Sequence, residues 1–165
     1  MKSGMEAALD PIDHLLVQLL QADGRATQLE LSKEVGLSQP ATAERIRKLE
    51  DSGVITGYTA LVDATRLGKD VTAFVGVSIE HPRYFEGFIK KVLLLPEVLE
   101  CHRVAGQDSY LLKVKTQSTL SLDTLLTEAI RVIPGVSRTF TTIALSSVKE
   151  DTHVHVDPQL TRRKS

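Results

Sequence analysis

The first sixty residues carry hydrophobic positions at helical spacing. An i, i+3, i+4, i+7, i+8 stripe is formed by Ile12, Leu15, Leu16, Leu19 and Leu20. Asp10-Pro11 precedes the stripe and supplies an N-cap and a proline at the first helical position, and Asp23-Gly24 supplies a stop signal. The pattern therefore predicts an amphipathic helix that begins at Pro11 and ends before Asp23-Gly24.

Two further helices are predicted on either side of a short turn. Thr27 and Glu30 form a capping box at the start of the second helix, which ends at Gly36 because glycine favours the left-handed C-terminal conformation. Ser38 caps a third helix, which continues to Gly53. A short helix, a Gly-Leu-Ser turn and a second helix at this spacing are typical of a helix-turn-helix.

The third helix has one side suited to a core and one suited to a partner. At 100° per residue, Thr42, Ile46 and Leu49 form the buried side. In a helix-turn-helix, the first turn enters the major groove of DNA, where helix N–H groups also favour phosphate. The alternative is an ordinary three-helix bundle whose exposed charges are only solvated. The candidate DNA-contacting residues lie in the first turn, on the outward side and on its flank: Ser38, Gln39, Ala41, Glu44, Arg45, Arg47 and Lys48.

Beyond residue 70, strand-like alternation and helix-like stripes follow one another. Strands are predicted over residues 71–80, 98–104, 110–116 and 136–145, and helices over residues 85–95 and 118–133. The segment Val92–Val98 resembles Ile130–Val136, since both read as a helix end, a proline and a strand start. Two such halves in the order β-α-β-β-α-β predict an α+β fold, a ferredoxin-like sandwich of one antiparallel sheet and two helices.

These patterns divide the chain into four parts. We expect a helix-turn-helix domain of the winged type over residues 1–57, a linker strand and hinge over 58–70, the βαββαβ domain over 71–149, and a C-terminal strand or tail over 150–165. The two helices cover one sheet face only, yet several strands are rich in Val, Leu and Ile on both faces. A second subunit would cover the free face, so we expect a homo-oligomer.

Composition narrows the class of protein. With 165 residues, 42% of them hydrophobic and 25% charged, the chain is typical of a soluble globular protein. No apolar run reaches the roughly 20 residues that span a membrane, and no secretory signal is recognisable. The single cysteine, Cys101, excludes an internal disulfide and a cysteine-based zinc site. We therefore expect a cytoplasmic protein without a metal or another cofactor.

The overall charge does not by itself suggest nucleic acid. The net charge is −1, and residues 1–60 hold nine acidic side chains against six basic ones. Placement matters more than the sum, because phosphates respond to charges within roughly 8–10 Å. Three of the six bases fall between positions 45 and 48, which leaves room for a local basic surface.

Several segments together resemble the leucine-responsive/asparagine-responsive (Lrp/AsnC) regulators, also called feast/famine regulators. The matching stretches span about residues 9 to 145 in the family's order: LDPIDHLLVQLLQADGR, LELSKEVGLS, RIRKLEDSGVITGYTA, ECHRVAGQDSYLLKV and IPGVSRTFT. The resemblance implies a DNA-binding transcriptional regulator that forms dimers, often assembled into octamers, and binds a palindromic operator. It also implies that the strand from Tyr58 to Val62 helps to pair subunits.

The same resemblance implies a site between subunits for an amino acid or a related small effector. In the family, the glycine-aspartate turn after the second strand belongs to this site, and threonines of the last strand often lie nearby. Turn N–H groups can donate to a carboxylate, the Asp108 carboxylate can accept from an ammonium, and threonine hydroxyls can bond to either group. A structural alternative is that Gly106 only makes a hairpin capped by Asp108. The corresponding residues are Ala105, Gly106, Gln107, Asp108, Tyr110, Thr139 and Thr141.

Two features depart from a simple match. Glu44 lies on the expected DNA-facing side of the third helix, where a carboxylate repels phosphate. Its carboxylate either accepts a hydrogen bond from a cytosine amino group in the major groove or pairs with Arg47 or Lys48 along the helix. The tail beyond Glu150 ends in Arg162-Arg163-Lys164, a basic end that touches phosphate or is only solvated.

Two rival functions use the same scaffold. One is an effector-binding assembly module without DNA binding, which Glu44 and the acidic first domain favour slightly. The other is an enzyme resembling the sirohaem decarboxylases, which requires histidines and arginines in a large pocket. The histidines are scattered through the sequence. His153 and His155 are two residues apart and so share one face of a strand, where they serve either as metal ligands or only as exposed side chains. No paired carboxylates, nucleophile-base set or phosphate loop stands out, so no catalytic residue is predicted.

Overall fold

The computed structural model describes residues 9–156, which form two compact units. The first unit contains the described residues up to Leu61 together with the segment that begins at Asp151. The second unit runs from Val62 to Glu150. The segment 151–156 therefore belongs with the first unit, and the chain passes between the units twice.

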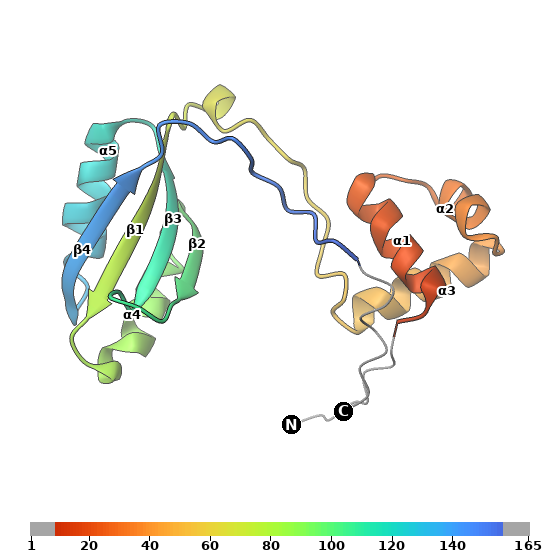
Figure 1. Ribbon diagram of the computed structural model, residues 1–165, viewed down its shortest axis with the longest axis horizontal. Helices are drawn as coiled ribbons and strands as arrows, with labels where there is room; N and C mark the ends of the chain where they lie inside the picture. The colour runs from red at the N-terminus through yellow and green to blue at the C-terminus, as the bar shows by residue number, and fades with distance from the viewer. Residues whose placement is uncertain (1–8, 157–165) are drawn as a thin grey trace. The chain divides into compact units, whose positions relative to one another are not determined.

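The first unit is built on three helices (Figure 1): α1 (Pro11–Ala22), α2 (Gln28–Val35) and α3 (Gln39–Asp51). The expected caps are present, since Asp10, Thr27 and Ser38 each accept a hydrogen bond from a backbone N–H in the first turn of its helix. Gly36 ends α2 in the left-handed conformation, at φ 67°. The core of this unit centres on one leucine from each helix: Leu16, Leu31 and Leu49.

The second unit is a four-stranded antiparallel sheet with two helices on one face (Figure 1). Its strands β1 (Val71–Ile79), β2 (Val98–Arg103), β3 (Tyr110–Thr116) and β4 (Val136–Ile143) lie in the order β2-β3-β1-β4. The helices are α4 (Phe85–Val92) and α5 (Thr119–Thr124), and the π-helical segment η3 (Leu125–Ile130) continues α5. The β-α-β-β-α-β order is confirmed.

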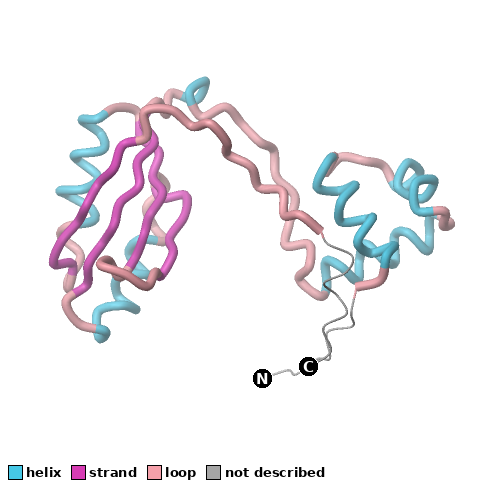
Figure 2. Tube along the Cα trace, viewed as in Figure 1, coloured by secondary structure: helices cyan, strands magenta, loops and turns pink. Residues whose placement is uncertain are grey.

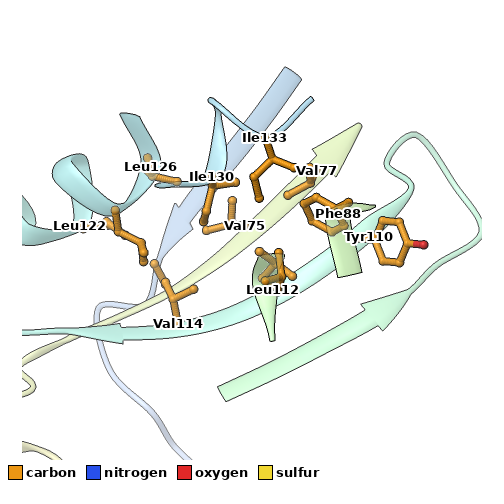
Figure 3. Packing of buried hydrophobic residues seen from close by; sticks show 13 residues of the cluster. Val75, Val77, Phe88, Tyr110, Leu112, Val114, Leu122, Leu126, Ile130 and Ile133 are labelled. Carbon is orange, nitrogen blue, oxygen red and sulfur yellow. The ribbon is translucent and has the colours of Figure 1, made fainter. Parts of the chain in front are cut away.

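The core of the second unit lies between the sheet and its helices (Figure 3). Val75 and Val77 of β1, Leu112 of β3, Phe88 of α4 and Ile130 of η3 are fully buried there. Alternate residues of each strand point to this face because successive side chains of a strand point to opposite sides. The hydrophobic alternation therefore marked the helix-covered face correctly.

One predicted strand is absent. Residues 56–62 are extended but form no strand in the described part of the chain, and Figure 2 shows them as loop. A strand is defined by hydrogen bonds to a neighbour, and a single chain offers this segment none. Tyr58 is instead tied to the end of α3, because its hydroxyl donates to the Glu50 carboxylate at 2.9 Å.

The segment after Asp151 returns to α1. The backbone N–H of Val154 donates to the side-chain oxygen of Gln21, and the side-chain nitrogen of Gln21 donates to the carbonyl of Val154 at 3.0 Å. His153 bridges the Asp151 carboxylate and the backbone carbonyl of Gln21. These bonds explain why the segment groups with the helical unit. The basic end Arg162-Arg163-Lys164 lies outside the described residues.

Candidate DNA-binding and effector sites

The outer surface of α3 is formed by the side chains that the periodicity assigned to it. Thr42 and Leu49 are buried as predicted. Thr42 also donates from its hydroxyl to the Ser38 carbonyl at 3.0 Å, which fixes the first turn of α3. The remaining candidates on this surface are exposed: Ser38, Gln39, Ala41, Glu44, Arg47 and Lys48.

Glu44 pairs with Arg47 on this surface. Its two carboxylate oxygens accept from Nη2 of Arg47 at 2.8 and 3.0 Å, and one of them also accepts from Nε at 3.1 Å. Asp51 accepts from Nη1 of Arg47 at 3.0 Å. The hydrogen bonds from Arg47 lower the pKa of Glu44. Of the alternatives open for Glu44, the structure shows the pairing with Arg47.

Lys48 is less engaged than Arg47. Its ammonium lies 3.7 Å from Glu44, beyond ordinary hydrogen-bond length, and its side chain is 70% exposed. Lys48 is therefore the more accessible cation of the two for a phosphate.

Arg45 is bound to the start of α1. Its Nη1 donates to Asp10 at 2.6 Å and to Asp13 at 2.8 Å, the two carboxylates of the α1 capping box. Burial alone would raise the pKa of Asp10, but hydrogen bonds from the Asp13 N–H and from Arg45 outweigh it and lower that pKa. This side chain therefore ties α3 to the start of α1, and a DNA contact by Arg45 on the flank of α3 stays a prediction.

The turn between β2 and β3 places Asp108 over the helix-free face of the sheet. Oδ1 of Asp108 accepts from the Ser78 hydroxyl at 2.9 Å and from Nη2 of Arg138 at 3.3 Å. A Cβ at Gly76 would overlap the Asp108 carboxylate, so Asp108 can occupy this position only because residue 76 has no side chain. Gly76, Ser78 and Arg138 were missed from the sequence because only strand pairing brings them to Asp108.

The other expected effector residues do not all join Asp108. Ala105, Gly106 and Gln107 are exposed in the turn beside it. Gly106 has no left-handed φ, and nothing lies near its Cβ position, so the hairpin does not require a glycine there. Tyr110 belongs to the helix-covered core, against Phe85 and Phe88, with its hydroxyl pointing away from the core (Figure 3).

Thr139 and Thr141 also lie on the helix side of the sheet. They pair with Val77 and Val75, which are buried under the helices, whereas Gly76 pairs with Phe140 on the opposite face. Thr139 accepts from Nε of Arg131 at 2.8 Å, and the Thr141 hydroxyl is buried without a hydrogen-bond partner in the described structure. Within one chain, Tyr110 and both threonines therefore lie on the opposite side of the sheet from Asp108, and a site between subunits that includes all of them remains a prediction.

Two kinds of site are not found within the described residues. Between positions 9 and 156, no three His, Cys, Asp or Glu side chains gather in a group that could hold a metal ion. In the same range, every helix is too short or too polar to cross a membrane.

Both units match known protein families. Residues 9–56 match a winged helix-turn-helix DNA-binding family, and residues 72–154 match the Lrp/AsnC ligand-binding domain. The leucine-responsive regulatory protein of Escherichia coli strain K12 is 40% identical over 144 residues, which cover 86% of this chain and 88% of that protein.

Solved structures agree with this match. The leucine response regulatory protein LrpA of Mycobacterium tuberculosis has a TM-score of 0.81 and 37% identity, covering 90% of this chain and 100% of that one. A transcriptional regulator of Neisseria meningitidis in complex with L-methionine has a TM-score of 0.84 and 30% identity, covering 89% and 96%. The fold and the relatives define a DNA-binding transcriptional regulator with a ligand-binding domain. The chain belongs to the Lrp/AsnC family.

Proposed function

We propose that this regulator binds an imperfect palindromic operator as a homodimer, or as an octamer built from dimers, and that a free amino acid or a related metabolite modulates the binding. The observation that carries the proposal is the outer surface of α3, which presents Lys48 and the Arg47–Glu44 pair on a firmly capped helix. Ser38, Gln39 and Ala41 in its first turn then approach base edges and phosphates.

The helix-free sheet face supports self-association. Strand pairing places Phe140 and Leu111 on either side of Gly76, and Phe74 lies on the same face. These three side chains are 65%, 38% and 40% exposed, respectively, in a single chain. Charged residues flank them, among them Lys113 and Arg138. An apolar centre with a charged rim is the usual composition of a subunit interface.

Asp108 and its surroundings support an effector role for the turn. The side chain is mostly shielded yet lies at the edge of the uncovered face, with Arg138 at 3.3 Å. A carboxylate beside a guanidinium complements the ammonium and the carboxylate of an amino acid. The exposed turn residues 105–107 add backbone N–H groups that can receive the carboxylate.

DNA binding is tested by selecting operators from a random duplex library with the full chain, followed by titrations over a range of salt concentrations. We expect selected sites with two-fold symmetry and an affinity that falls steeply as salt rises. Lys48→Ala should weaken binding to all sequences, and Lys91→Ala, a substitution of an exposed lysine on α4, serves as the control. Failure to select any sequence would contradict the proposal and favour an assembly module without DNA binding.

A further inference from the structure

A cavity of about 320 Å³ lies at the end of the sheet where the chain enters and leaves the second unit. One wall is the hinge between Val62 and Thr72, and another is the segment 144–150 that follows β4. Lys115, near the end of β3, completes the lining. The cavity lies far along the sheet from the Asp108 turn, because Lys115 pairs near the start of β1 whereas Tyr110 pairs near its end.

Both connections between the two units start from the walls of this cavity. The chain enters the second unit at Val62 and leaves it after Glu150, and both residues line the cavity. The backbone N–H of Ala144 donates to the Thr72 carbonyl at 2.9 Å, which joins the two walls at the sheet. A molecule that contacts both walls would therefore reduce the freedom of both connections at once.

Several charges in the lining are already satisfied. Asp63 accepts from the backbone N–H and the hydroxyl of Thr65, and these bonds lower its pKa. Glu150 lies 2.9 Å from the ammonium of Lys115 and 2.8 Å from that of Lys113. These side chains line the cavity, but their charges are already satisfied by neighbouring protein groups.

One cation and one anion of the lining remain available. Lys69 is half-buried, and within residues 9–156 its ammonium has neither an ion pair nor a hydrogen bond. The carboxylate of its neighbour Asp70 likewise has no partner in that range. The hydroxyls of Thr72, Ser146 and Ser147 add groups that both donate and accept. A half-buried ammonium without a counter-ion favours an anionic group in the cavity.

We propose that this hinge cavity, which is defined by Lys69, Asp70 and the walls named above, is a second effector site that binds a small zwitterion such as a free amino acid. The proposal rests on the metabolite response proposed above and adds a site distinct from the Asp108 turn. Lys69 binds the carboxylate of the ligand and Asp70 its ammonium. The volume lies at the lower end of the range for small-molecule sites, which suits an amino acid. Because the ligand bridges the two connections, its binding changes operator affinity.

The test compares four variants of the full chain with the wild type in a thermal-shift screen of the twenty free amino acids at millimolar concentration. Lys69→Met removes the cation of the cavity, Asp108→Asn changes the turn, and Lys91→Met is a matched control on α4. We expect at least one amino acid to raise the Tm of the wild type, of Lys91→Met and of Asp108→Asn, and to have no effect on Lys69→Met. Lys69→Arg, which keeps the cation, should retain the shift.

The effect on DNA is measured with the same proteins. The active amino acid should change operator affinity about fivefold or more in the wild type and leave Lys69→Met unchanged. Equal affinity of Lys69→Met and wild type without ligand shows that the variant is folded. Stabilisation that survives Lys69→Met and Lys69→Arg but is lost in Asp108→Asn would overturn the hinge site alone, because the effector response would remain. Absence of any response in the wild type would overturn the effector response itself and the hinge site with it.

Discussion

Glu44 holds Arg47 in a bidentate pair on the surface of α3 that is expected to face DNA, with N–O distances of 2.8 and 3.0 Å to Nη2. Both side chains are about half exposed, so water screens the pair and it contributes little to stability. The pair is thus weak enough for DNA to rearrange, yet it neutralises the arginine in the free protein. Glu44 thereby limits the non-specific attraction of the α3 surface for phosphate.

Glu44→Gln should increase affinity for non-specific DNA. The substitution removes a charge that repels phosphate and frees Arg47, so the slope of log affinity against log salt should steepen by about 1. Fluorescence anisotropy on random duplexes at several salt concentrations measures this. Glu86→Gln, which breaks the Lys90 pair on α4, is the control with the same change in charge. Weaker binding to the operator with unchanged non-specific binding would show instead that Glu44 reads a base.

Arg45→Ala should destabilise the helical unit more than Lys48→Ala does. Arg45 bonds both carboxylates of the α1 capping box, and its loss should cost about 1 kcal/mol after allowance for partial exposure. Lys48→Ala should change stability by about 0.5 kcal/mol or less. Urea denaturation followed by circular dichroism compares the two. Equal stabilities would argue against the structural role of Arg45.

Gly76→Ala should disrupt the effector turn without unfolding the sheet. The added Cβ would overlap the Asp108 carboxylate and displace it from Ser78 and Arg138. We expect loss of the ligand response of the turn, measured by calorimetry with an amino acid whose binding is lost in Asp108→Asn. Gly106→Ala is the matched control, since its Cβ would meet nothing and its φ is ordinary. An equal response in both alanine variants would remove Asp108 from the site.

The contact between residues 151–156 and α1 should become less stable as pH rises. Hydrogen bonds that the His153 ring donates to the Asp151 carboxylate and to the Gln21 backbone carbonyl raise the pKa of His153 above its ordinary value of 6.5. A raised pKa in the folded state adds stability below pH 6.5, and this stability is lost as pH rises through the folded value. Amide exchange of Val154 should therefore accelerate with pH beyond the intrinsic rate. His153→Gln should abolish this dependence and His155→Gln should keep it; the reverse result would contradict the assignment.

Phe140→Asp should weaken self-association. Phe140 is 65% exposed on the helix-free face of the edge strand β4, so a carboxylate there would be buried unpaired in the proposed interface. Light scattering after size-exclusion chromatography should show a smaller assembly than the wild type. Leu120→Asp, at a 75% exposed position on α5, should leave the mass unchanged. The opposite pattern would place the interface on the helices.

Much of the fold was predictable because its signals are local. Caps at Asp10, Thr27 and Ser38 and the stop at Gly36 act within one helical turn, so they place three helices without knowledge of the rest. Hydrophobic alternation likewise placed the β-α-β-β-α-β order and the buried face of β1. The segment 56–62 forms no strand within the described chain because a strand needs a hydrogen-bonded neighbour, so its pairing with a second subunit stays a prediction.

The sequence by itself determined the helix-turn-helix, the sandwich and the residues exposed on α3, since periodicity and capping are properties of neighbouring residues. Only the tertiary structure decided which charges remain available. It assigned Arg45 to the capping box of α1, paired Arg47 with Glu44, and placed Asp108 on the opposite sheet face from Thr139. These outcomes depend on strand register and helix packing between distant residues. A shift of one residue in register would move each side chain to the other face, and no local signal reports the register.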